Sequence, residues 1–204
     1  MSNIDVYSNV VYNNLYEGIA VTDEEEGGNV HDIRVYNNSI YGNGLQQVNS
    51  GACLFVGSNV SKTTFSHNTC VGNIQGILVD GTWLIDKNGG STPQDIHFIN
   101  NIFATNGWRH GGVKDVDGLM LRNNLFTAEY EEFISDEGGM TNMTEEGNVS
   151  ATDVGFVDVF TNDYQLTPES PAVDAGATTE VTTDFAENPR PSGEAPDIGA
   201  YENQ

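Results

Sequence analysis

One asparagine recurs along this chain with similar apolar residues around it, and this repeat limits the folds that the chain can adopt. The clearest copies are centred on Asn9, Asn38, Asn68, Asn101 and Asn124, which follow one another at 29, 30, 33 and 23 residues. Asn148 adds a weaker sixth copy. Repeats of this length are typical of stacked supersecondary units, so one closed globule is not expected.

Within each copy, polar and apolar residues alternate as they do in a β-strand. Apolar residues stand five and three positions before the asparagine, as Ile96 and Phe98 do before Asn101. A short run led by glycine, such as 76–79, follows in most copies. No segment has the length and the 3.6-residue period of a helix. Two or three short strands per turn, with Asn and Gly at the corners, predict an all-β fold, a right-handed parallel β-helix.

The recurring asparagines predict hydrogen-bonded ladders along the coil. A second set stands five residues after the first in four copies, at Asn14, Asn43, Asn73 and Asn106. Equivalent residues of stacked turns lie about 4.8 Å apart, so identical amides can bond to one another along the axis. Asparagine also tolerates the left-handed backbone of a sharp corner. We therefore interpret these asparagines as structural.

The repeat occupies residues 1–150, and a segment of a different kind follows at 151–204. We expect this segment to be a C-terminal cap packed on the same solenoid, because an uncovered end rung presents bare strand edges. A cluster of carboxylates is expected around Arg190 within it. These carboxylates are Asp174, Asp184 and Asp197. The first rung has no such cover, and this would allow end-to-end self-association through it.

The C-terminal segment also carries a long and specific motif. It consists of Leu166, Ser170-Pro171-Ala172, Asp174, Gly176, Arg190-Pro191 and the run Asp-Ile-Gly-Ala-Tyr-Glu at 197–202. With the asparagine repeats ahead of it, the motif resembles the C-terminal part of secreted right-handed β-helix proteins of the pectate-lyase-like superfamily. The resemblance implies the β-helix fold, an extracellular or cell-surface location and association with polysaccharides. That superfamily includes lyases, hydrolases, epimerases and non-catalytic surface proteins, so the motif predicts the fold far better than the activity.

The chain is strongly acidic, with 30 Asp and Glu residues against 7 Lys and Arg and a net charge of −23. Nucleic acids and anionic membrane surfaces are poor partners for the field of such a protein. No run of about 18 apolar residues predicts a membrane span. Two explanations remain for the acidic surface, which are solvation and the collection of divalent cations such as Ca²⁺.

The two cysteines, Cys53 and Cys70, are too few for a disulfide framework. Cys70 stands in an apolar column of the repeat and is expected to be buried. A bridge between the two is one alternative, but the sequence does not place them opposite each other. We therefore favour free thiols.

Candidate site residues lie in the third and fourth copies, where a substrate would run along the outer face of one sheet. Counting four residues from Gly76 and from Gly111 reaches Asp80 and Asp115, which predicts two carboxylates in one column. Adjacent turns would hold these carboxylates about 5 Å apart, close enough to share a metal ion. We therefore expect Asp80 and Asp115 to bind Ca²⁺.

Two kinds of polysaccharide cleavage are compatible with these residues. In a lyase, Ca²⁺ would neutralise a uronate carboxylate while Lys114 or Arg109 removed the α-proton. In an inverting hydrolase, Asp80 and Asp117 would flank the glycosidic bond, which requires carboxyl groups about 6.5–9.5 Å apart. The alternative is that all of these residues are ordinary polar groups on a solvated sheet.

Further residues are expected to wall a groove and bind the substrate. These are Trp83, Lys87, Trp108 and His110. Tryptophan in a loop or at a corner suits stacking on sugar rings, although each Trp is equally suited to covering the flank of the coil. Four of the seven basic residues lie between 87 and 122, and binding of a uronate would require such clustering of positive charge.

The function expected from these features is binding, and cleavage if the site is catalytic, of an acidic or neutral extracellular polysaccharide. The rival expectation is a non-catalytic adhesive or surface-layer stalk, in which the coil is a spacer and the acidic faces bind cations. A truncated or inactive relative of the enzymes is a third alternative.

Overall fold

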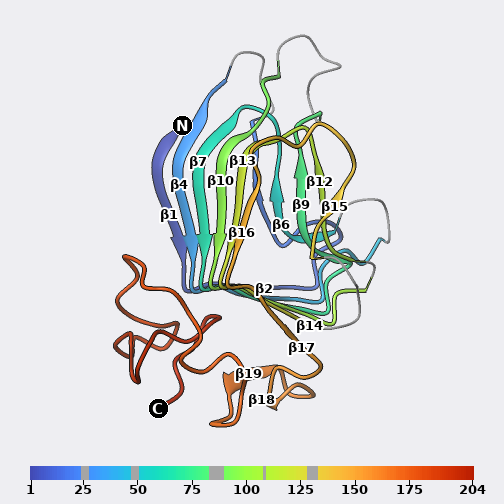
Figure 1. Cartoon of the computed structure of the whole chain (residues 1–204). Coiled ribbons are helices and arrows are strands. Elements are labelled where there is room, and N and C mark those ends of the chain that lie inside the picture. The colour runs from blue at the N-terminus through green and yellow to red at the C-terminus, as the bar shows by residue number, and fades with distance from the viewer. Residues whose placement is uncertain (24–27, 47–50, 83–89, 108, 128–132) are drawn as a thin grey trace.

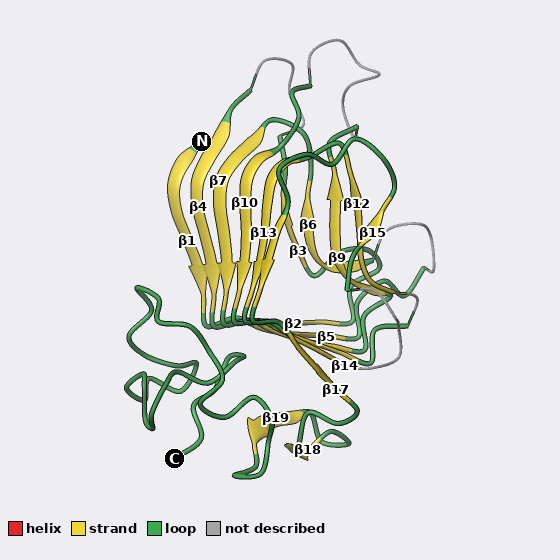
Figure 2. Ribbon diagram, viewed as in Figure 1, coloured by secondary structure: helices red, strands yellow, loops and turns green. Residues whose placement is uncertain are grey.

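The protein is a coil of three parallel β-sheets with an irregular C-terminal tail beside it (Figures 1 and 2). This computed structural model describes residues 1–204 except 24–27, 47–50, 83–89, 108 and 128–132. The described residues include no helix that could span a membrane. The right-handed parallel β-helix predicted from the repeat is confirmed.

Sheets A and C face each other across the core, and sheet B joins them along one side (Figure 2). Sheet A contains, in spatial order, β1 (Ser2–Tyr7), β4 (Val30–Tyr36), β7 (Val60–Ser66), β10 (Gln94–Ile99), β13 (Asp117–Arg122) and β16 (Thr144–Glu146). Sheet B contains β2 (Val10–Tyr12), β5 (Ser39–Tyr41), β8 (Thr69–Val71), β11 (Ile102–Ala104), β14 (Leu125–Thr127) and β17 (Val149–Ala151). Sheet C contains β3 (Ile19–Val21), β6 (Ala52–Val56), β9 (Gln75–Asp80), β12 (Arg109–Lys114) and β15 (Ser135–Asp136).

The core consists of columns of equivalent side chains stacked from turn to turn. Phe65 and Phe98 are stacked with ring centroids 4.8 Å apart, and Phe103 lies 5.1 Å from Phe126 in the same way. All four rings are fully buried. The alternation seen in the sequence therefore directs every second strand residue into the coil.

Both predicted asparagine ladders are present at the two ends of sheet B. In the first ladder, Nδ2 of each asparagine donates to Oδ1 of the next over 2.9 to 3.1 Å, from Asn9 through to Asn148. The second ladder runs from Asn14 to Asn106. The residue before each first-ladder asparagine has a positive φ, as Asn37 and Asn100 do at 52° and 57°. The corner thus needs a residue that tolerates the left-handed region.

The two cysteines form a disulfide between sheets B and C, so the expectation of free thiols is wrong. Cys53 on β6 and Cys70 on β8 are both fully buried, with Cα atoms 5.8 Å apart. The periodicity directed each residue inward. Which inward positions meet across the core depends on the turn between the strands, and the repeat alone does not determine that.

The tail packs on the side of the coil and does not close its end. Its apolar residues, including Leu166, Ala172 and Ile198, cover outward residues of sheet B such as Ile102 and Leu125. These outward positions are apolar, and burying them is favourable. The short hairpin of β18 (Phe156–Asp158) and β19 (Asp163–Leu166) belongs to this region. The last strand of sheet A, β16, remains exposed, contrary to the expected end cap.

Arg190 is buried in the tail, as expected, but its ion-pair partner is Glu202. Its guanidinium lies 2.5 Å from the Glu202 carboxylate, and both side chains are fully enclosed. The same guanidinium donates to the backbone carbonyls of Asp197 and Gly199. The carboxylates of Asp174, Asp184 and Asp197 instead accept hydrogen bonds from backbone N–H groups of the tail. The sequence thus predicted the buried arginine and not its partner.

Candidate functional site

The strand register brings Lys114, and not Asp115, next to Asp80. β9 and β12 pair with Val79 opposite Val113 and Asp80 opposite Lys114. The count from Gly76 and Gly111 was wrong by one residue, because Gly111 lies opposite Ile77. The predicted column of two carboxylates is therefore absent.

The arrangement of Asp80 and Asp115 does not fit the expected Ca²⁺ site. Oδ1 of Asp80 accepts hydrogen bonds from the backbone N–H and the hydroxyl of Thr82, over 2.9 and 2.5 Å. Asp115 lies at the next corner with a φ of 48°, and its backbone N–H donates to Gly138 on the following turn. Each residue therefore shapes its own turn, and we derive no metal-dependent step from them.

Two other predicted site residues do not have the positions that we expected. His110 is inside the coil, where Nε2 lies 2.5 Å from the carbonyl of Thr127 and the ring packs on Phe126. It is 1% exposed and is not a groove wall, because its position in β12 faces the core. Asp117 begins β13 in sheet A, where hydrogen bonds from Asn142 and Thr141 lower the pKa of its carboxyl. Neither residue belongs to the sheet C site as predicted.

The remaining predicted residues are described in part or not at all. Arg109 pairs with Gln75 through the strand backbone, which places it at the start of β12. Trp83, Lys87 and Trp108 lie outside the described residues. The structure therefore tests neither the sugar-stacking role nor the binding role assigned to them.

A groove at which we expected no site lies on the outer face of sheet A. It consists of two hollows that share Arg34 and Thr64. The first, here called the Lys62 hollow, has a volume of about 370 Å³ and is lined by Asn3, Asp5, Asp32, Ile33, Arg34, Lys62 and Thr64. The second, here called the tail hollow, has a volume of about 320 Å³ and is lined by Arg34, Tyr36, Thr64, Ser66, Ile99 and residues 178–181 of the tail. Each volume falls at the lower end of the range for small-molecule sites, about 300–1,000 Å³.

Arg34 is the residue around which the groove is organised. Its guanidinium forms two hydrogen bonds to the Asp5 carboxylate, of 2.8 and 2.5 Å, and these bonds lower the pKa of Asp5. A third guanidinium nitrogen lies 3.5 Å from the carboxylate of Glu180 on the tail. The guanidinium carbon also lies 5.9 Å from the centre of the Tyr36 ring. Asp5 and Tyr36 therefore fix Arg34, while the exposed Glu180 occupies its remaining face weakly.

Lys62 is the second cation of the groove and is exposed. Among the described residues, no carboxylate lies within ion-pair distance of its ammonium group. Its φ is 48°, whereas the equivalent left-handed positions of the other turns hold Asn, Asp or Gly. Those positions are Asn3, Asp32, Asp95, Gly118 and Asn142. A lysine with this left-handed backbone inside β7 is unfavourable, and strain of this kind is often found at functional sites.

The groove offers hydrogen-bond donors and acceptors together with one aromatic face. Hydroxyl groups come from Thr64, Ser66, Thr178 and Thr179, cations from Arg34 and Lys62, and carboxylates from Asp32 and Glu180. Tyr36 lies between Tyr7, on which it stacks, and the tail hollow. Such a mixture suits a polyhydroxylated ligand. The unusual lysine was the only indication in the sequence, since the tail wall comes from residues far along the chain.

Comparisons with known proteins give a distant likeness to solved structures. No family model matches the sequence, and no curated protein matches it. Among solved structures, the chain is similar to "Crystal structure of pectate lyase Pel9A", with a TM-score of 0.37 and 14% identity. The match covers all of this chain and 66% of that chain. A likeness this distant carries no argument about activity or ligand.

Proposed function

We propose that this protein binds an extracellular polysaccharide along the outer face of its coil. The observation that supports the proposal most is the groove on sheet A, where two adjoining hollows hold hydroxyl groups, two cations and an aromatic ring. Sugar-binding sites require such hydrogen-bonding groups beside an apolar face. Both acidic and neutral polysaccharides are compatible with it, because Lys62 and Arg34 are accompanied by Asp32 and Glu180.

The disulfide supports an extracellular or cell-surface location. Disulfides persist in oxidising compartments and are rare in the cytosol of most organisms. The Cys53–Cys70 bridge is fully buried between two sheets, so it is part of the folded core. The strongly acidic surface agrees with a protein that does not bind nucleic acid.

Binding is tested by titrating the protein with a panel of neutral and uronic-acid polysaccharides. Tyr36→Ala combined with Lys62→Gln should weaken binding at least about tenfold, which corresponds to about 1.4 kcal/mol. Arg122→Gln is the matched control, since Arg122 also points outward from sheet A but lines neither hollow. If no polysaccharide binds, or if both variants behave alike, the groove is not the binding site.

Cleavage is a second candidate function, favoured by the position of Lys114 beside Asp80. Glu137 follows on the next turn, where its backbone N–H donates to Val113. Lys114 thus ends β12 between Asp80 of the turn before and Glu137 of the turn after. Lysine is one of the residue types that can act as a general base. A lyase product would show new ultraviolet absorbance, and Lys114→Gln should abolish it. The rival function, a non-catalytic stalk, would be favoured if the protein binds polysaccharide without forming any product and also self-associates into an extended particle.

A further inference from the structure

His67 occupies a corner of the coil at which neighbouring turns use asparagine to hold the tail. The equivalent residues on the second, fourth and fifth turns are Asn37, Asn100 and Asn123. Their Nδ2 groups donate to tail carbonyls of Thr183, Ala177 and Ala175, respectively. The tail therefore follows this column of corners from one turn to the next. At the third turn it meets an imidazole in place of an amide.

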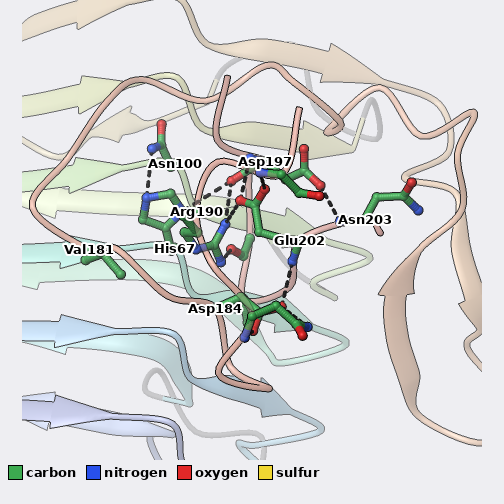
Figure 3. Close-up of polar contacts among 12 residues, drawn as sticks. His67, Asn100, Val181, Asp184, Arg190, Asp197, Glu202 and Asn203 are labelled. Atoms are coloured by element: carbon green, nitrogen blue, oxygen red, sulfur yellow. Dashed lines mark hydrogen bonds and ion pairs between the residues drawn. The ribbon is translucent and has the colours of Figure 1, made fainter. Parts of the chain in front are cut away.

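The imidazole of His67 is bonded on both sides (Figure 3). Nδ1 lies 3.2 Å from the carbonyl of Asp197, so it donates and carries the proton of the neutral ring. Nε2 then accepts hydrogen bonds from Nδ2 of Asn100, at 3.0 Å, and from the hydroxyl of Thr179, at 3.1 Å. A second proton on Nε2 would point at the amide donor of Asn100. It would also remove the acceptor for the Thr179 hydroxyl.

The charges around the ring also oppose its protonation. Complete burial of the ring, together with the positive charge of the Arg190 guanidinium, holds the pKa of His67 well below 6.5. The carboxylates of the tail have other partners. Glu202 pairs with Arg190, and Asp184 accepts a hydrogen bond from the N–H of Asn188. Asp197 accepts hydrogen bonds from the N–H groups of Asp174 and Asn203. The tail carboxylate of Glu180, one residue from Thr179, is directed to Arg34. None of these groups offers an acceptor to a protonated imidazole.

Thr179 connects this corner to the groove. It lines the tail hollow together with Thr178, Glu180 and Val181, and these four residues form its wall on the side of the tail. Val181 is anchored in turn by its N–H, which donates to the Thr179 hydroxyl. Residues 178–181 lie between the anchors at Ala177 and Thr183, and Thr179 links them to His67. Loss of this bond would loosen the segment that encloses the hollow.

We infer that His67 anchors residues 178–181 only while its ring is neutral. Protonation of His67 opens the tail hollow and weakens ligand binding there. The effect on ligand binding rests on the function proposed above, whereas the opening of the tail does not. Packing of residues 178–181 on the coil, here called docking, lowers the pKa of His67. Docking is therefore strongest above the pKa of the free histidine, where the ring is neutral, and it weakens as the pH falls below that value. From a free pKa near 6.5, docking should weaken by up to about thirtyfold at pH 5.

Hydrogen exchange measured by mass spectrometry on the full chain tests the opening. Between pH 7.5 and pH 5, after correction for intrinsic exchange, the opening of residues 178–181 should increase by at least about tenfold. Residues 94–99 of β10 serve as an internal reference that should not change. In His67→Asn, which restores the amide used by the other turns, the pH dependence should disappear. Equal pH dependence in both proteins would overturn the inference.

A measurement on the native chain guards against misfolding of the variant. The imidazole proton signals of His67 should titrate well below pH 6.5 in nuclear magnetic resonance spectra. A His67 titration near 6.5 without tail opening would also overturn the inference.

Ligand binding gives the final arm, with polygalacturonate as the probe. The native protein should bind it at least about tenfold more weakly at pH 5 than at pH 7.5, and His67→Asn should bind equally at both. If polygalacturonate does not bind at pH 7.5, the proposal that the protein binds acidic polysaccharides is wrong. Hydrogen exchange still tests whether His67 anchors residues 178–181. If the tail opens in acid and binding does not change, the link between the tail and the site is wrong.

Discussion

Nδ2 of Asn101 donates a hydrogen bond of 2.9 Å to Oδ1 of Asn124, its equivalent on the next turn of the coil. The same nitrogen donates to the carbonyl of Phe65 on the preceding turn, and Oδ1 of Asn101 accepts from Asn68. Asn101 is fully buried, so every partner of its side chain is another protein group. One residue thus links three turns and satisfies polar groups that water cannot reach.

Replacing Asn101 with alanine should therefore cost much more stability than replacing Asn9. Asn101→Ala leaves buried partners without a hydrogen bond, and each such group costs on the order of 1–3 kcal/mol. Asn9 is exposed on the first turn, where water replaces the lost bonds. Urea denaturation of both variants checks this expectation. Equal and small losses at the two positions would contradict the role of the ladder.

The ladders and the strands were predictable because both depend on residues close in sequence. Asn101 and Asn124 occupy the same place in consecutive copies, and a coil brings equivalent places together whatever the loops between them do. The error at Asp80 and Asp115 arose because we aligned two positions that are not equivalent in consecutive copies. Gly76 and Gly111 appeared equivalent, but β9 and β12 pair one residue out of that alignment. Gly76 stands three residues after Asn73 and Gly111 five after Asn106, so the second ladder already marks the two glycines as not equivalent.

Arg190 provides a test of the buried ion pair in the tail. Arg190→Ala leaves the enclosed carboxylate of Glu202 without its counter-charge, and breaking a buried pair in this way costs about 3–5 kcal/mol. Arg34→Ala is the control, because its pair with Asp5 is partly exposed and such pairs are worth about 0–1 kcal/mol. Thermal and urea unfolding measure both losses. Adding Glu202→Gln to Arg190→Ala should recover part of the stability, and failure to do so would point to lost packing as the cause.

The disulfide should contribute substantially to stability. Cys53 and Cys70 are separated by 17 residues, and closing a loop of that size in the unfolded chain is worth about 3 kcal/mol. The double variant Cys53→Ala/Cys70→Ala should lose about that much free energy of unfolding. A reducing agent should bring the native protein close to the variant and leave the variant unchanged. If reduced and oxidised native protein unfold at the same urea concentration, the bridge does not stabilise the fold.

The groove could not be predicted because its two sides come from opposite parts of the chain. Arg34 and Glu180 are 146 residues apart and belong to the coil and the tail. The sequence motif in the tail indicated a segment packed on the solenoid, but the side on which it packs depends on the apolar outward residues of sheet B, such as Ile102 and Leu125. Lys62 alone carried a local signal, since the repeat places Asn, Asp or Gly at its position on the other turns.

That exception predicts opposite effects of one substitution on stability and on binding. The φ of Lys62 is 48°, and asparagine occupies the same left-handed position at Asn3 and Asn142. Lys62→Asn should therefore increase the free energy of unfolding by about 1 kcal/mol, since a lysine gains nothing locally in this conformation and asparagine does. Loss of the ammonium group from the Lys62 hollow should at the same time weaken polysaccharide binding. Lys114→Asn is the control for stability, because Lys114 lies in the regular strand β12, where asparagine is no better than lysine. Urea denaturation and polysaccharide titration of the same preparations give both quantities. A variant that becomes more stable without losing affinity would show that Lys62 does not bind the ligand, and a variant that becomes less stable would show that its side chain supports the fold.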